Sequence, residues 1–198
     1  MAFLKIKKSP QKYVRKYAYL LLLSFCKTVK ACYNCSMKIL GIDPGLAIVG
    51  YSVIDFDGDN VVLLNSGSIK TSKNNTESQR LLEIFEDITT IIEKYKPDFA
   101  SVEKLFFFKN QKTVMPVAAA RGVIMMALEK CSIKAFEYTP MEVKQVLTGY
   151  GRADKKEVEQ MVKIALNCDV LPCLDDTVDA MAIAICHTRS NCDRLVKV

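Results

Sequence analysis

Residues 39–53, ILGIDPGLAIVGYSV, constrain the fold most, because they open with an apolar run that ends in a single acid. The run at 39–42 predicts a buried β-strand, and the Pro44-Gly45 pair that follows leaves Asp43 at the strand end. Burying an isolated carboxylate is costly unless it is paired or bound to a metal. The partners of Asp43 must then come from elsewhere in the chain.

Two more strand-like segments follow the first. Residues 50–56 and 61–69 are separated by the sequence DGDN at 57–60. This turn chemistry between two strand-like runs predicts a β-hairpin. The chain therefore starts with three strands.

After the hairpin the pattern changes to helix and then strand. Thr76, with Gln79 three residues later, forms a capping-box pattern ahead of apolar residues at helical spacing, and Pro97 ends that helix. Residues 98–103 then predict a buried strand that ends in a second acid, Glu103. The order βββαβ predicts an α/β fold.

Five more elements complete the chain. The first two are a helix over 113–130, which Pro116 interrupts early, and a strand at 135–138. The next helix has Thr139 at N-cap, Pro140 at N1 and Glu142 at N3. After a break at Gly149-Tyr150-Gly151, one helix runs from Asp154 to about Leu166 and the last covers 175–187. The last helix is almost wholly apolar after its acids, so we expect it to be buried against the sheet.

Length and composition favour one globular domain, since the chain has 198 residues and half of them are apolar. The net charge of +6 suggests a nucleic-acid partner, but residues 1–36 hold eight of the 28 Lys and Arg residues and no acid. Residues 37–198 then carry 20 basic and 22 acidic side chains. The body of the chain is slightly acidic, and the excess positive charge belongs to its first 36 residues.

We expect the chain to divide into an N-terminal extension, 1–36, and a body, 37–198. The extension joins a basic start to a short apolar run at 17–26, as a secretory signal does, although Lys27 and Lys30 fit such a signal poorly. Three interpretations stay open: a non-native or dispensable segment, a targeting segment, and an added DNA-binding arm. We expect no membrane association for 37–198.

The cysteines and the single histidine exclude several kinds of site. Cys32 and Cys35 form a C-x-x-C pair without a second pair or a nearby histidine, so a zinc site is incomplete. The five cysteines of the body are scattered, which favours reduced thiols in a cytoplasmic protein. His187 lies in an apolar helical pattern and is expected to pack or to face solvent. The sequence therefore offers few residues for nucleophilic catalysis by a Ser-His or Cys-His pair.

Four acids occur where a buried or half-buried element begins or ends: Asp43, Glu103, Asp176 and Asp179. Asp176 and Asp179 are three residues apart and share one face of a helix in its first turn. Taken singly, each acid is more often a turn former or a helix cap. Taken together, they can converge on one sheet, and converging carboxylates need a cation such as Mg²⁺ or Mn²⁺. A site with two such ions hydrolyses phosphodiesters with water as the nucleophile.

Five segments carry a resemblance to a known family. They are GIDPG at 41–45, SVEKLFFFKN at 101–110, AAARG at 118–122, EYTPMEVKQVLTGYGRADKKEV at 137–158 and DDTVDAMAIAICH at 175–187. In this order they resemble the motifs of the RuvC family of Holliday-junction resolvases and span nearly all of 37–198. The resemblance implies a ribonuclease H-like fold, with a mixed five-stranded sheet flanked by helices. It also implies a homodimer that makes Mg²⁺-dependent paired nicks in four-way DNA junctions during recombination and repair, and a partner complex of branch-migration helicases.

The resemblance places the four catalytic and metal-binding acids on Asp43, Glu103, Asp176 and Asp179, with two Mg²⁺ ions, or Mn²⁺ in their place. One question of register stays open, because Asp175 lies four residues before Asp179 and shares much of the same helix face. The family spacing of two acids three apart favours Asp176.

DNA-binding residues are expected near these acids. The resemblance gives Phe106 a role at the junction centre, where an exposed aromatic ring stacks on an unpaired base. Lys144 and Lys155 lie within the matching motifs and are the first candidates for contacts with phosphates, followed by Arg152 and Lys156. The alternative for Phe106 is a place in the core, and for the lysines a solvated surface.

Two other functions remain as alternatives. A different ribonuclease H-like nuclease, acting on RNA or RNA–DNA hybrids, would use the same acids. A non-catalytic, nucleotide-binding relative of the actin-like ATPases would share the Asp-x-Gly turn at residues 43–45. Such a relative should carry further Gly- and Thr-rich phosphate loops, which the sequence lacks.

Overall fold

The computed structural model describes residues 36–105, 111–171 and 175–190, all within one compact unit, Ser36–Val198. The expectations for the extension 1–36 and for Phe106 concern residues outside these ranges. The boundary between extension and body therefore stays a prediction.

A five-stranded mixed sheet forms the centre of the described unit. Its strands are β1 (Met37–Asp43), β2 (Ile48–Phe56), β3 (Val61–Lys70), β4 (Phe99–Glu103) and β5 (Lys134–Tyr138), in the spatial order β3-β2-β1-β4-β5. β1, β2 and β3 pair antiparallel, whereas β4 and β5 run parallel to β1. This arrangement confirms the expected fold class. The predicted hairpin joins β2 to β3, and in its turn the Asp57 carboxylate accepts hydrogen bonds from the backbone N–H groups of Asp59 and Asn60.

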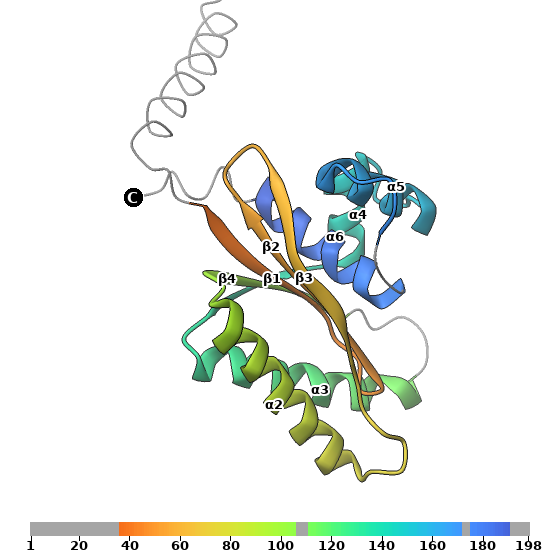
Figure 1. Cartoon of the computed structure of the whole chain (residues 1–198). Helices are drawn as coiled ribbons and strands as arrows, with labels where there is room; N and C mark the ends of the chain where they lie inside the picture. The colour runs from red at the N-terminus through yellow and green to blue at the C-terminus, as the bar shows by residue number, and fades with distance from the viewer. Residues whose placement is uncertain (1–35, 106–110, 172–174, 191–198) are drawn as a thin grey trace, which may run out of the picture. The chain divides into compact units, whose positions relative to one another are not determined.

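Helices cover both faces of the sheet (Figure 1). One face carries α2 (Glu77–Tyr95) and α3 (Gln111–Lys130), and the other carries α4 (Pro140–Thr148), α5 (Lys155–Leu166) and α6 (Asp175–Ser190). Capping boxes start three of these helices, with Thr76, Thr139 and Asp154 as their N-caps. Each N-cap side chain accepts a hydrogen bond from the N3 backbone N–H, which explains why the chain turns into a helix at these points.

The expected interruption at Pro116 is wrong, because α3 runs from Gln111 through Pro116 without a break. Pro116 stands in the second turn, so its missing N–H removes one intrahelical hydrogen bond close to the helix start. Ala120, Ile124 and Leu128, farther along α3, are completely or almost completely buried. This packing outweighs the local cost of the proline.

Two apolar layers hold the fold together, one on each face of the sheet. Leu40 and Ile42 of β1 pack with α2 and α3, whereas Ile39 packs with α4, α5 and α6. This alternation follows from the two-residue period of a strand. Gly41 and Asp43 share the face of Ile39, so the first acid points toward the α6 side of the sheet.

The last helix, α6, is buried against β1 and β2 as the sequence predicted. His187, near its end, is 1% exposed, and its Nδ1 lies 2.7 Å from the Tyr138 hydroxyl oxygen. Phe99 and Phe136 flank the same imidazole ring. His187 therefore has the packing role that was expected. Among the described residues, no helix combines the length and apolar character needed to cross a membrane.

Candidate active site

Asp43 and Glu103 end two neighbouring parallel strands on the same face of the sheet. Ile42 of β1 pairs with Val102 of β4, so the next residue of each strand, Asp43 and Glu103, stands at the carboxyl edge. Ala100 and Val102 of β4 belong to the α2/α3 layer, which places Glu103 on the opposite face, the one that α6 covers. Carboxyl edges of this kind are where open α/β sheets bind ligands.

α6 brings the other two acids to this edge. Asp176 and Asp179 lie in its first turn, and both side chains are partly exposed. The hydroxyl of the buried Ser52, on β2, donates a hydrogen bond of 3.0 Å to the carbonyl oxygen of Ala180 and ties the start of α6 to the sheet. The structure thus unites all four predicted acids, while the side chain of Asp175 lies outside the description.

The carboxylates affect one another strongly. Burial raises the pKa of Asp43 to about 8, and the nearby charges of Glu103, Asp179 and Asp176 act in the same direction. Burial also raises the pKa of Glu103, an effect that its hydrogen bond with Asp43 opposes in part. Two carboxyl groups can share a hydrogen bond only if one of them carries a proton. Burial and mutual repulsion therefore make the two carboxyl groups resist full ionisation.

A cleft of about 250 Å³ adjoins the acids. Its lining includes Glu103 and Asp179 together with Lys144 and Lys155. The Lys155 ammonium lies 3.5 Å from a carboxylate oxygen of Asp179, and both side chains are well exposed. An exposed pair at this distance contributes little to stability. The lining of the cleft thus combines carboxylates with ammonium groups.

The four acids fit a hard divalent cation by chemistry and charge, because carboxylate oxygens are the ligands that Mg²⁺ and Mn²⁺ prefer. The raised pKa values of Asp43 and Glu103 indicate a site that does not readily keep all its negative charge without a cation. Within the described ranges, no three Asp, Glu, His or Cys side chains are placed to hold one ion.

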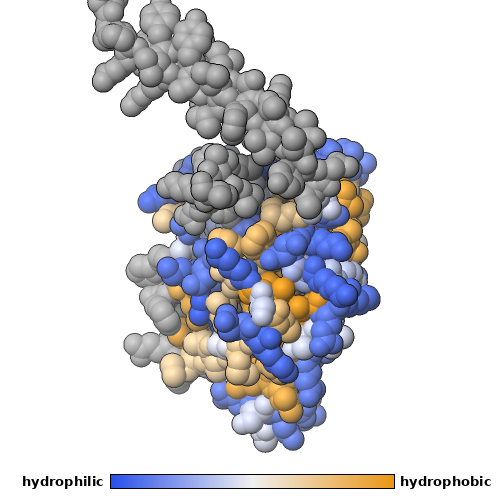
Figure 2. All heavy atoms as spheres, turned by 90° about the vertical axis from the view of Figure 1, so that its left-hand side faces the viewer, coloured by the Kyte–Doolittle hydropathy of each residue, from blue (hydrophilic) through white to orange (hydrophobic). Residues whose placement is uncertain are grey.

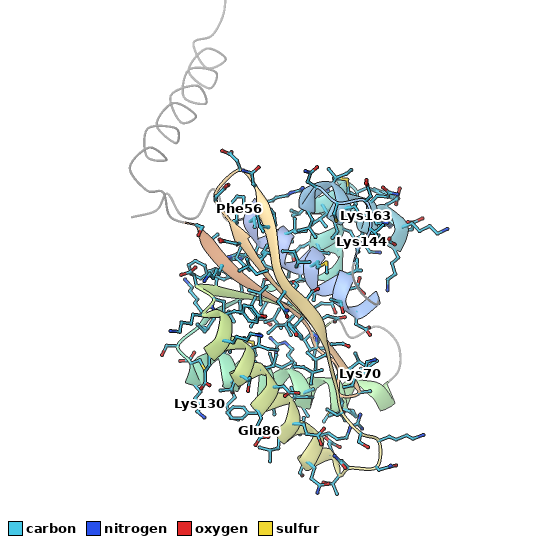
Figure 3. All side chains as sticks on the ribbon, viewed as in Figure 1. Phe56, Lys70, Glu86, Lys130, Lys144 and Lys163 are labelled. Atoms are coloured by element: carbon cyan, nitrogen blue, oxygen red, sulfur yellow. The ribbon has the colours of Figure 1, made fainter. Side chains whose placement is uncertain are left out.

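The predicted DNA-binding residues divide into two groups. Lys144, on α4, and Lys155, at the start of α5, line the cleft beside the acids. Figure 3 shows Lys144 and Lys163 on the α4/α5 side of the sheet and Lys130 and Glu86 on the α2/α3 side.

The second group lies apart from the acids. Arg152 lines a separate cleft of about 500 Å³, together with the exposed side chains of Met141 and Tyr150. Lys156 is exposed and lines neither cleft. Gly149 caps α4 with φ of 80°, so a sharp turn accounts for this glycine.

Sequence reasoning missed the apolar wall of the first cleft. Pro140 and Val143 of α4, Val158 of α5, and Ala182 and Ile183 of α6 line it together with the charged groups. The sequence placed Pro140 at N1 of its helix and predicted a buried last helix, but it gave no sign of a cleft there. It also missed Glu137, whose carboxylate pairs with the guanidinium of Arg121 across β5 and α3.

A family model described as "Crossover junction endodeoxyribonuclease RuvC" matches residues 39–187. The chain belongs to the RuvC family. The match includes all four acids and every described element from β1 through most of α6, and it confirms the resemblance seen in the motifs. The rival assignment to the actin-like ATPases is not favoured.

Curated members of the RuvC family are close relatives. The chain is 50% identical over 154 residues to "Crossover junction endodeoxyribonuclease RuvC" from Halothermothrix orenii, covering 78% of this chain and 93% of that one. It is 46% identical over 154 residues to the protein of the same name from Alkaliphilus metalliredigens, covering 78% and 94%. These alignments span almost the whole length of the relatives.

Solved structures give the same assignment. The structure of Thermus thermophilus RuvC matches with a TM-score of 0.74 and 30% identity, covering 80% of this chain and 96% of that one. T. thermophilus RuvC in complex with a Holliday junction substrate matches with the same TM-score and identity, covering 77% and 93%. The yeast mitochondrial Holliday junction resolvase Ydc2, at 15% identity and a TM-score of 0.54, shares the fold.

Proposed function

We propose that the chain resolves Holliday junctions by nicking two strands of a four-way DNA junction. Membership of the RuvC family makes it a metal-dependent nuclease that hydrolyses phosphodiester bonds. The observation that carries the proposal is the meeting of Asp43 and Glu103 with the first turn of α6, beside a cleft that Lys144 and Lys155 line. The relative solved with a Holliday junction substrate supports the choice of substrate.

Asp43, Glu103, Asp176 and Asp179 are the proposed ligands of two Mg²⁺ ions. When bound, such ions supply an activated water and stabilise the leaving oxygen of the phosphodiester. A bound cation would favour the ionised carboxylates of Asp43 and Glu103, whose pKa values burial raises, so metal binding should release protons. Asp176 is preferred to Asp175 because its spacing of three residues from Asp179 matches the family pattern.

The basic residues of the cleft bind and orient the DNA backbone in this proposal. Lys155 exchanges its contact with Asp179 for a phosphate, and Lys144 holds a neighbouring phosphate from α4. Arg152 and Lys156 extend the contact away from the acids, and Phe106 stacks at the junction centre. The described lining of the cleft holds no Ser, Cys or His side chain. Water is the proposed nucleophile, activated as in two-metal hydrolysis, with no covalent intermediate.

The working unit is proposed to be a homodimer, so that two sites act on opposed strands of the junction. The proposed dimer is supported by apolar side chains on the outward face of α3. Met115 and Met126 on this helix are 73% and 56% exposed, and a Cβ added to Gly122 would meet no atom within 4 Å. A helix face that stays in water is normally polar. Hydrophobic areas are also visible between hydrophilic ones on the face of the body drawn in Figure 2.

Gly122→Glu is expected to convert the dimer to a monomer, because a charged side chain at this open position would be buried between two copies of α3. The fold should persist, since no atom of the described residues lies within 4 Å of the added Cβ. Light scattering on the purified protein measures the mass. Leu82→Glu, at a 55% exposed position of α2, is the matched control and should stay dimeric. If the Gly122→Glu protein is still a dimer, the proposal that α3 forms the interface is wrong.

Cleavage of a synthetic mobile four-way junction tests the proposed function. The full chain, with Mg²⁺, should make paired and symmetric nicks that EDTA abolishes, and the fragment 37–198 should do the same if the extension is dispensable. A hybrid RNA–DNA duplex tests the remaining rival. Degradation of the hybrid with an intact junction would keep the fold and reject the substrate.

Three further assignments belong to this proposal. The extension 1–36 is separate from the nuclease body, and the protein works in the cytoplasm. Reduced thiols fit that location, since Cys131, Cys168 and Cys186 are free within the described residues. A branch-migration helicase complex is the proposed protein partner.

A further inference from the structure

Two glycines lie under α6 where its backbone meets the sheet. Gly50 of β2 pairs with Asp43 of β1, and Gly41 of β1 pairs with Ser52 of β2. Gly41, Gly50 and Ser52 are buried under α6, whose residues at the contact include Ala180 and Ala184. Small side chains on both partners let a helix backbone approach a sheet closely.

The approach at Gly50 is so close that no larger residue fits. A Cβ at Gly50 would lie 2.6 Å from the carbonyl carbon of Asp176 and 3.3 Å from its Cβ, and it would overlap the carbonyl oxygen. Real Cβ atoms essentially never come within 3.0 Å of another heavy atom. The obstacle is backbone on both sides, in β2 and in α6, so no side-chain rotation relieves it.

A second contact one turn later holds the same helix. A Cβ at Gly41 would lie 2.8 Å from the Ala184 Cβ and would overlap the carbonyl oxygen of Ala180. That carbonyl also accepts the 3.0 Å hydrogen bond from the Ser52 hydroxyl. The first two turns of α6 therefore rest on the backbone of β1 and β2.

We propose that Gly50 is a positioning residue that sets the separation between Asp176 and Asp43, and with it the metal affinity of the site. This inference rests on the proposed function, in which both acids bind metal. Gly50 pairs with Asp43 and touches the backbone of Asp176, so it joins an acid of the sheet to an acid of the helix without touching substrate. An alanine there moves the first turn of α6 outward by roughly 1 Å.

The experiment measures binding of Mn²⁺ alone to the full chain by calorimetry. Gly50→Ala should weaken Mn²⁺ binding by roughly 10–100-fold, as removal of an outer-shell support does. Gly67→Ala is the matched control. The three atoms nearest to its Cβ all belong to the side chain of Tyr51, on the face of the sheet away from α6, so Mn²⁺ binding should stay within about twofold of wild type.

A rescue variant separates positioning from a general loss of structure. Asp176→Glu adds one methylene, about 1.5 Å of reach, and in the Gly50→Ala background it should recover part of the lost affinity. The same change in the wild-type background should weaken binding, because the longer side chain then overshoots. A purely structural defect at Gly50 would not respond in opposite ways to one substitution.

Three results would overturn the inference: wild-type affinity in Gly50→Ala, an equal loss in Gly67→Ala, or no rescue by Asp176→Glu. If circular dichroism shows that Gly50→Ala does not fold, Ser52→Ala replaces it. That variant removes the hydroxyl that ties α6 to β2, and it should weaken Mn²⁺ binding severalfold. Unchanged binding in Ser52→Ala would then reject the inference. Absence of Mn²⁺ binding in the wild type would instead contradict the proposed metal site itself.

Discussion

Asp43→Asn is expected to abolish junction cleavage while junction binding survives. The substitution keeps the shape of the side chain at the end of β1 but replaces the carboxylate, a proposed metal ligand beside Glu103, Asp176 and Asp179, with a neutral amide. We expect the cleavage rate to fall by at least roughly a thousandfold, which corresponds to about 4 kcal/mol of lost transition-state stabilisation. Binding depends mainly on the phosphates that Lys and Arg neutralise, so junction affinity should change little.

Single-turnover nicking and a gel-shift assay on the same junction measure the two quantities. Asp87→Asn, at an exposed position of α2, is the matched control and should cut at the wild-type rate. Asp176→Asn and Asp175→Asn extend the series, since only the first should reproduce the Asp43→Asn result. Undiminished cutting by Asp43→Asn would reject the catalytic assignment, and loss of binding would point to a structural defect.

The metal-free protein should become less stable as the pH rises from about 4 toward 8. Asp43 has a folded-state pKa of about 8 against an ordinary value of 3.8, and burial is the main cause. Between these values the folded chain holds a proton that the unfolded chain has released, so the free energy of unfolding falls with pH. The stability that protonated Asp43 contributes is fully present below the pKa of the unfolded state and is lost as the pH rises through the pKa of the folded state. We expect a decline of a few kcal/mol, since one pKa unit corresponds to about 1.4 kcal/mol.

Urea unfolding in EDTA at pH 5.5, 6.5 and 8 measures this slope. Hydrogen bonds with Thr139 lower the pKa of Glu142. This carboxylate makes the free energy of unfolding rise with pH, but only in more acidic solution. Asp43→Asn should flatten the slope and stabilise the metal-free protein at pH 8, and Mg²⁺ should stabilise the wild type there through binding to the folded state. A wild-type slope that is flat or rises with pH would contradict the burial of these acids.

The sequence predicts most local features of this fold because local chemistry determines them. The DGDN turn at 57–60 and the caps at Thr76, Thr139 and Asp154 have the predicted structure. Pro116 is the exception, because the burial of α3 against its neighbours overrides the local preference. Tertiary packing of this kind leaves no mark in the residues next to the proline.

The composition of the site was predictable, but its geometry was not. The four acids could be selected because carboxylates at the ends of apolar elements are unusual, and the order of the motifs supported them. The pairing of β1 with β4, the contact of Lys155 with Asp179 and the close approach of α6 at Gly50 depend on long-range packing. One sequence alone does not give the depth at which a helix lies on a sheet.

The late position of α6 in the chain affects how the enzyme is made. Asp43 and Glu103 leave the ribosome early, but Asp176 and Asp179 belong to the last described helix. Until α6 is synthesised, the sheet face that carries Ile39 and Ile54 lacks its main cover. A chain that lacks α6 is thus recognisable to chaperones and proteases by its exposed apolar surface. With Asp176 and Asp179 as the proposed ligands, DNA cutting would have to wait until α6 is synthesised and has covered this face.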